Sequence, residues 1–147
     1  MDLPTVGRRD YAERKSKGRK RSYENKEVAS VNAVLNKHLK AVNELDPEKR
    51  KVFFEEVYDP HIHFVDPQGI ANGLAELEKL YDGLHKQFPG FVFHEVGEIE
   101  AHHDVARIHW ELVKPGASVK PTGDDFIKIK DGRITEVYVI VNGQPSR

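Results

Sequence analysis

The 147-residue chain is 38 % hydrophobic and 32 % charged, which predicts a single folded domain with a well-solvated surface. It has no cysteine, which excludes disulfides, thiolate catalysis and cysteine-bound zinc. No apolar run is long enough to span a membrane, and the N-terminus is charged where a signal peptide would be apolar.

The net charge of −1 conceals two differently charged parts of the chain. Residues 8–21 carry eight basic and two acidic side chains, whereas residues 28–147 carry 14 basic and 19 acidic ones, and 14 − 19 leaves this body at −5. Residues 1–26 show neither helical nor strand periodicity and almost no aliphatic side chains. We therefore predict a disordered basic arm at 1–26 and a folded domain at 27–147.

The run from Lys17 to Arg21 is the part of the arm best suited to binding a partner. Such runs serve as nuclear import signals or as weak nucleic-acid contacts, and they also occur as plain solvated tails. We expect a cytoplasmic protein without a membrane partner. A nuclear location, and nucleic-acid binding through residues 8–21, are the alternatives.

Three helices are predicted in the first part of the body. The first begins at Glu27, and the second begins at Asp46-Pro47-Glu48, where an aspartate cap precedes a proline, and runs to about Tyr58. Asn72 is predicted to cap the third helix, which Phe88-Pro89-Gly90 ends. The apolar positions expected to face the core are Val28, Val31, Val34, Leu35, Leu39, Val42 and Leu45, then Val52, Phe53 and Val57, then Leu74, Leu77, Leu80, Tyr81 and Leu84.

Strands dominate the rest of the chain. A short strand at His61–Val65 precedes the third helix, and turn signals after that helix separate four strands at about 91–100, 104–113, 119–130 and 134–141. The last turn contains Asp131-Gly132, a pair favoured in two-residue hairpins. Helices followed by antiparallel strands predict an α+β fold, in which a strongly curved sheet wraps around the helices and leaves a pocket.

Asp66 is the most informative single residue, because it follows the apolar strand end Phe64-Val65 and precedes a turn. A carboxylate fixed by a strand and partly stripped of water has a raised pKa, which suits a proton shuttle. The alternative is structural, since Asp-Pro is a common turn opener in which the aspartate accepts local backbone N–H bonds.

Four short segments follow one another in the body of the chain: Val65-Asp66-Pro67 with Gly69 and Gly73, His102-His103-Asp104 leading to Trp110, Gly123-Asp124-Asp125-Phe126, and Asp131-Gly132-Arg133-Ile134. Together with the predicted helices they cover about residues 30–142, and their order resembles the nuclear transport factor 2-like superfamily. This superfamily includes SnoaL-like cyclases, ketosteroid isomerases, scytalone dehydratase and limonene-epoxide hydrolase. The resemblance implies a cone in which three N-terminal helices pack on a curved, mostly antiparallel sheet that encloses a pocket. It also implies a homodimer formed through the outer face of the sheet.

Within that superfamily, ketosteroid isomerase resembles this chain most closely in its chemistry, with an aspartate base facing a tyrosine and a protonated aspartate. The resemblance makes Asp66 the general base and Asp124, two residues before Phe126, the protonated donor. The expected tyrosine of the first helix is replaced by His38. This departure matters because a histidine donates a hydrogen bond over a shorter reach and with a different acidity.

Asp124 and Asp125 are neighbours on a predicted strand, so only one of them faces the pocket. The spacing of the template favours Asp124. The alternative places Asp125 inside, on the same side as Ile127 and Ile129.

Aromatic side chains are expected to form the core and the wall of the pocket. We predict that Trp110, Tyr58, Phe126 and Asp125 contact the substrate. Trp110 shares a face with Ala106, Ile108 and Leu112, while Arg107, His109 and Glu111 lie opposite.

Histidines raise the question of a metal. His61 and His63 share a strand face, and His102 and His103 could add ligands, but no carboxylate stands at a recognisable ligand spacing beside them. His103 is more simply a turn residue. We therefore expect no metal and no cofactor.

Two functions fit these observations. The first is a small-molecule enzyme of SnoaL-like or ketosteroid isomerase-like type, in which Asp66 removes a proton next to a carbonyl or hydroxyl while Asp124, kept neutral, and His38 stabilise the oxyanion. Isomerisation, cyclisation and dehydration all fit this scheme, with a small apolar oxygenated molecule as substrate. The alternative is a dimeric binding module without catalysis, carrying a basic targeting arm.

Overall fold

The structure is a computed structural model, and it describes residues 19–143. Within these residues the helices are α2 (Arg19–Asn43), α3 (Pro47–Val57) and α4 (Leu74–Gln87). Helix α2 begins at Arg19, so the segment 19–26, which was assigned to the arm, is helical. Residues 1–18 lie outside the described residues, and the division of the chain at residue 26 stays a prediction.

Six strands form one curved sheet in the order β2-β1-β6-β5-β4-β3. All neighbouring strands are antiparallel except β1 and β6, which run parallel. This confirms the predicted α+β architecture with a mostly antiparallel sheet. The strands are β1 (Tyr58–Asp66), β2 (Gly69–Asn72), β3 (Val92–His102), β4 (Val105–Val113), β5 (Thr122–Lys130) and β6 (Arg133–Val141).

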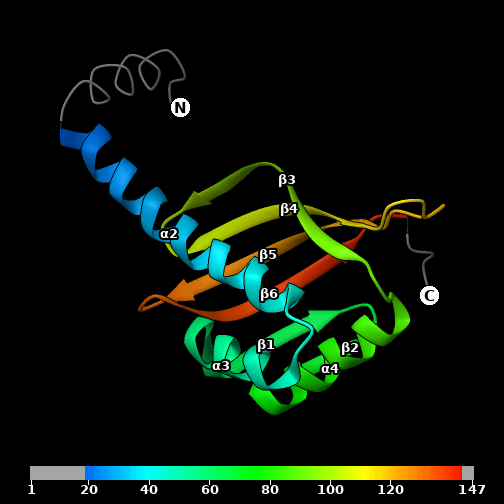
Figure 1. Ribbon diagram of the computed structural model, residues 1–147. Coiled ribbons are helices and arrows are strands. Elements are labelled where there is room, and N and C mark those ends of the chain that lie inside the picture. The colour runs from blue at the N-terminus through cyan, green and yellow to red at the C-terminus, as the bar shows by residue number, and fades with distance from the viewer. Residues whose placement is uncertain (1–18, 144–147) are drawn as a thin grey trace.

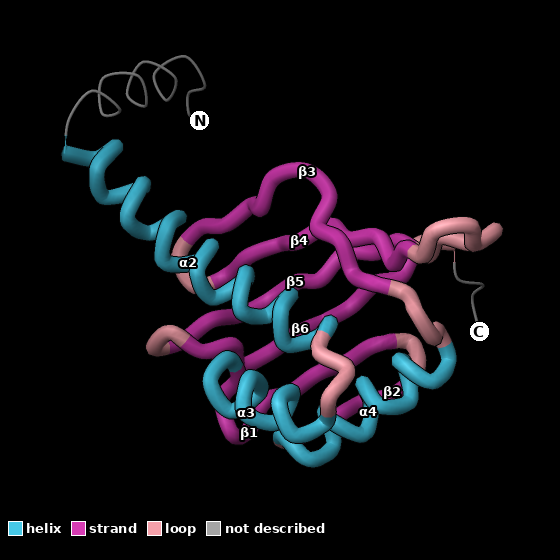
Figure 2. The backbone as a smooth tube through the Cα atoms, viewed as in Figure 1, coloured by secondary structure: helices cyan, strands magenta, loops and turns pink. Residues whose placement is uncertain are grey.

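The helices lie on one side of the sheet, as Figure 1 shows. Helix α2 crosses the sheet and packs on β3 and α3, while α4 packs on β1 and β2. The tube in Figure 2 shows the strands curving around this helical layer. The core lies between the two layers and is built from α2 residues such as Leu35 and Val42 and inner-face residues such as Ile108 and Val137.

Several predicted boundaries are confirmed. Asp46 caps α3 by accepting a hydrogen bond from the backbone N–H of Glu48 at 3.0 Å, and Pro47 is the first helical residue. Asp131 and Gly132 form the turn between β5 and β6 with φ of 52° and 77°, the left-handed conformation that this hairpin turn requires.

Three local predictions are wrong. Leu45 is exposed because α2 ends at Asn43, and Val52 is exposed because the buried stripe of α3 runs through Arg50, Phe54 and Val57 instead. Asn72 does not cap α4. It pairs with His63 in the antiparallel ladder of β1 and β2, and Gly73 takes the cap position.

The strand that contains Asn72, β2, was not predicted. It is four residues long and its Ile70 points to solvent, so its sequence shows no alternation that could have revealed it.

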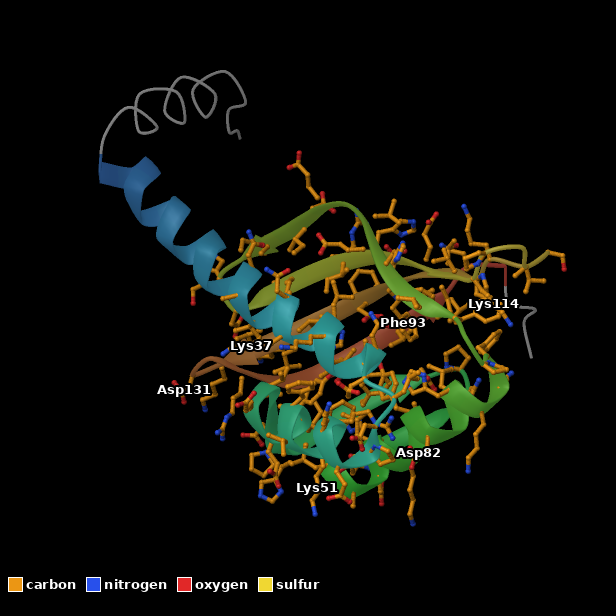
Figure 3. The ribbon with its side chains drawn as sticks, viewed as in Figure 1. Lys37, Lys51, Asp82, Phe93, Lys114 and Asp131 are labelled. Carbon is orange, nitrogen blue, oxygen red and sulfur yellow. The ribbon has the colours of Figure 1, made fainter. Side chains whose placement is uncertain are left out.

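Arg50 was also not expected inside the protein. Its side chain is 1 % exposed, donates to the carbonyl of Glu44 at 2.9 Å and forms an ion pair with Asp82 of α4, which is labelled in Figure 3. This ion pair joins α3, which Tyr58 of β1 follows directly, to α4, which carries Tyr81.

None of the helices in residues 19–143 is long and apolar enough to cross a membrane.

Candidate functional site

A cavity of about 310 Å³ lies between the helices and the inner face of the sheet. Most of its wall is apolar, and its buried polar groups come from α2, α4, β1, β4 and β5. Phe93 of β3, labelled in Figure 3, contributes to the wall. The lining residues are His38, Leu39, Val42, Phe64, Asp66, Pro67, Gln68, Tyr81, Leu84, Gln87, Phe88, Phe93, Ile108, Trp110, Leu112, Pro121, Asp125, Val139 and Val141.

Asp125, and not Asp124, faces this cavity. Asp125 is 7 % exposed, whereas Asp124 lies on the outer face and is bonded to His109 at 2.9 Å. Phe126 also lies on the outer face, so its predicted place in the pocket is wrong. The physical reason is strand alternation. Asp124 and Phe126 are two residues apart on β5, so their side chains lie on the same face of the sheet. The prediction that this face is the inner one therefore placed both side chains wrongly.

Gly123 explains how Trp110 reaches Asp125. A Cβ atom on Gly123 would lie 2.5 Å from the indole ring of Trp110, which is too close for any real side chain. The glycine therefore lets the indole lie against β5, and its Nε1–H donates to Oδ1 of Asp125 at 2.8 Å. Trp110 lines the cavity, as predicted from its strand face.

His38 contacts the other carboxylate oxygen of Asp125, and Tyr58 in turn contacts His38. His38, which is 2 % exposed, places Nε2 3.4 Å from Oδ2 of Asp125, and its Nδ1 lies 2.6 Å from the hydroxyl of Tyr58. Burial and then the charge of Asp125 raise the pKa of Tyr58 well above its usual 10, so the phenol keeps its proton.

The direction of the Tyr58 hydrogen bond sets the tautomer of His38. The phenol has no other acceptor among the described residues, and a buried donor left unpaired costs about 1–3 kcal/mol. Tyr58 therefore donates to Nδ1, and the proton of the ring sits on Nε2, directed at Asp125. Tyr58 lies behind His38 and outside the cavity wall, and His38 has both nitrogens engaged by protein groups.

Asp66 serves the turn with one oxygen. Its Oδ1 accepts the backbone N–H of Gln68 at 2.9 Å and of Gly69 at 3.1 Å, while Oδ2 has no hydrogen-bond partner within residues 19–143. Burial raises the pKa of Asp66 above its usual 3.8, these two N–H groups lower it, and the charge of Asp125 raises it again. Asp66 therefore both opens the turn and contributes a carboxylate to the cavity, so the structural and the functional interpretation apply to the same residue.

Tyr81 is a cavity residue that the sequence pattern placed only in the core. Its ring is 5 % exposed and meets the rings of Phe54, Phe64 and Phe93 edge-on at centroid distances of 5.8, 5.7 and 6.5 Å. Its hydroxyl takes part in no hydrogen bond between described residues, and it is not one of the sealed buried atoms of this part of the chain, so it is open to the cavity. The only signal in the sequence was a tyrosine within a stripe of leucines.

The structure places two of the histidines considered as metal ligands, His63 and His103, in a side-chain hydrogen bond and in a turn. His63 bonds Asn72 at 2.7 Å, and His103 sits in the turn after β3 with φ of 53°. Within the part of the chain that the structure describes, no three His, Cys, Asp or Glu side chains are arranged to hold a metal ion.

Comparisons with known proteins identify the family and the fold. The sequence profile of the SnoaL-like domain matches residues 35–137. A comparison with curated proteins found no match.

Similar solved structures share the fold. A candidate isomerase of the SnoaL-like family from Agrobacterium tumefaciens is 24 % identical, with a TM-score of 0.73, over 78 % of this chain and 99 % of that one. A candidate polyketide cyclase from Sinorhizobium meliloti is 18 % identical, with a TM-score of 0.62, over 76 % and 98 %. A candidate ketosteroid isomerase from Kribbella flavida is 15 % identical, with a TM-score of 0.62, over 82 % and 83 %.

Proposed function

Because the chain belongs to the SnoaL-like domain family, we propose that it is an enzyme that transfers a proton within a small, apolar, oxygen-bearing molecule. One observation carries this proposal. Two carboxylates from different strands, Asp66 and Asp125, face the same largely apolar cavity. Convergent titratable groups in such a cavity are the usual mark of acid–base chemistry.

Asp66 is the base in this scheme. Its Oδ2 takes a proton from a carbon next to a carbonyl group, and the electrons of the C–H bond move to the carbonyl oxygen as an enolate forms. If the enolate is conjugated with a C=C bond, return of the proton from Asp66 to the far carbon gives an isomer. Attack of the enolate on a second carbonyl closes a ring, and the new alkoxide takes the proton back from Asp66. A hydroxyl on the carbon next to the enolate can instead leave with that proton as water, which gives an alkene. None of these steps needs a cofactor.

Asp125 supports this base. Burial raises the pKa of Asp66 most, and the charge of Asp125 raises it further, which makes the Asp66 carboxylate a better proton acceptor. Trp110 and His38 hold Asp125 with one hydrogen bond to each oxygen, so it stays in place during the proton transfer. Asp125 thus takes the position in the cavity that was expected for Asp124, and it acts as a hydrogen-bond acceptor.

The test uses 2-tetralone, a small apolar ketone with acidic C–H groups beside its carbonyl. Deuterium exchange at those carbons in D₂O is followed by NMR. Asp66→Asn should lower the catalysed rate by about 10²–10⁴-fold, the range of general base catalysis, with little change in the thermal midpoint. The asparagine Oδ1 can still accept the two turn N–H groups.

Asp124→Asn is the matched control, because it makes the same chemical change on the outer face. It should leave the exchange rate unchanged. Unaltered exchange in Asp66→Asn, or a wild-type rate equal to that of buffer, would refute the enzyme proposal. Ligand binding without exchange would favour the alternative of a binding module.

A homodimer through the outer sheet face is a second proposal, supported by exposed apolar side chains on that face. Val105, Phe126, Tyr138 and Ile140 are between 39 % and 58 % exposed, and charges of both signs surround them. A surface of this kind can pair with a copy of itself. Sedimentation equilibrium should show a dimer for the wild type and a shift to monomer for Phe126→Asp. A monomeric wild type would contradict this.

A further inference from the structure

The charge balance of the cavity limits what can enter it. Two carboxylates, Asp66 and Asp125, face the cavity, and neither lysine nor arginine occurs among its described lining residues. A carboxylate or phosphate group on a ligand would meet two negative charges without a counter-ion in a partly desolvated space, which is strongly unfavourable. The wall therefore favours an uncharged ligand.

The hydrogen-bond donors inside the cavity are almost all in use. The Trp110 N–H and His38 Nε2 are directed at Asp125. The side chains of Gln68 and Gln87 are exposed at the mouth and bond each other at 2.6 Å. Among the buried residues of the described wall, the Tyr81 hydroxyl is the donor left without a protein acceptor.

The Tyr81 hydroxyl is also fixed in position and stays protonated. Its ring packs edge-on against Phe54, Phe64 and Phe93, which restricts its rotation. Burial, then Tyr58, Asp125 and Asp66, raise the pKa of Tyr81 well above 10. Since both carboxylates act on it, the hydroxyl lies within the field of the two groups that flank a bound ligand.

From these contacts we infer that Tyr81 donates its hydroxyl proton to the carbonyl or hydroxyl oxygen of an uncharged ligand, and that the cavity rejects anionic ones. The binding part of this inference stands on the cavity alone. Its catalytic part, in which Tyr81 stabilises the enolate oxygen when Asp66 removes the proton, rests on the proposed function. Tyr81 thereby takes the place of the first-helix tyrosine that this chain replaces with His38.

Trp110 supplies a built-in binding signal, because it lines the cavity and is the only tryptophan in the chain. Binding is measured by its fluorescence for three probes of one shape: 2-tetralone, tetralin without the oxygen, and tetralin-2-carboxylate with a negative charge. The variant is Tyr81→Phe. The matched control is Tyr138→Phe, which removes a hydroxyl that donates a hydrogen bond to Glu136 on the outer face.

Because Tyr81→Phe loses one neutral hydrogen bond, its affinity for 2-tetralone should be about 2- to 12-fold lower than that of the wild type. Tetralin should bind both proteins alike, Tyr138→Phe should match the wild type, and tetralin-2-carboxylate should bind at least about tenfold more weakly than 2-tetralone. The inference is overturned by equal 2-tetralone affinities in wild type and Tyr81→Phe. Tight binding of the carboxylate, or no binding of 2-tetralone to the wild type at millimolar concentration, also overturns it.

The Asp66→Asn variant separates this inference from the proposed function. It should bind 2-tetralone while it fails to exchange deuterium. If the wild type binds with the predicted Tyr81 dependence but does not catalyse exchange, the proposed function fails and the ligand inference stands. If deuterium exchange depends on Asp66 but 2-tetralone affinity does not depend on Tyr81, the proposed function stands and the ligand inference fails.

Discussion

On β4 and β5, two similar pairs of side chains sit one residue apart, on opposite faces of the sheet. On the inner face, Asp125 accepts the N–H of Trp110 at 2.8 Å, and on the outer face, Asp124 meets His109 at 2.9 Å. The inner pair is buried and the outer pair is partly open to solvent. The two pairs therefore differ in access to water and in the partner of the carboxylate, which is an indole inside and an imidazole outside.

That difference determines what each aspartate can do. A solvated His–Asp pair is worth about 0–1 kcal/mol and has little influence beyond itself. In the cavity, water screens the charge less, and the charge of Asp125 adds to burial in raising the pKa values of Asp66, Tyr58 and Tyr81. Acid–base chemistry thus depends on the face of the strand as well as on the residue type.

The largest effect that would sharpen this comparison is expected from the two tyrosines. Tyr81→Phe on the inner side should slow deuterium exchange of 2-tetralone by about 10²–10³-fold, since removal of one oxyanion donor typically costs that much. Tyr138→Phe on the outer side should leave the rate unchanged. Equal rates in both variants would show that the inner hydroxyl has no part in the reaction.

A smaller effect is expected from glycine. Gly123→Ala should lower the free energy of unfolding by about 1–3 kcal/mol, because its methyl group would collide with Trp110 and with the backbone oxygen of Ile140. Gly83→Ala in α4, where nothing lies within 4 Å, should raise it by about 0.5–1 kcal/mol. Thermal and urea unfolding of both variants check the opposite signs. A neutral Gly123→Ala would mean that the indole does not lie against β5.

Much of the fold was predictable from the sequence because its signals are local. The cap at Asp46-Pro47, the Asp131-Gly132 turn and the apolar spacing of α4 each identify an element without reference to the rest of the chain. The exposed strand β2 carries no such signal.

The site was less predictable, because it depends on which way side chains point. The alternation of Asp125 with Ile127 indicated the inner face correctly, and the spacing borrowed from a distant template pointed to Asp124. In the apolar stripe of α4, Tyr81 occupies a position that a leucine could also fill, so the pattern did not indicate a role for its hydroxyl. Only the three-dimensional structure shows that Tyr81 packs its ring against three phenylalanines and lines the cavity.

The central claim is that Asp66 works as a base whose pKa is raised by burial and, in addition, by the charge of Asp125. The pH dependence of 2-tetralone exchange tests it most directly, with wild type and Asp125→Asn compared. Because the active form is the carboxylate, the rate should rise with pH through the pKa of Asp66, with a wild-type midpoint above 3.8. In Asp125→Asn this midpoint should move to lower pH, since one cause of the raised pKa is gone. An unchanged midpoint, or a rate without an acid limb, would contradict the account.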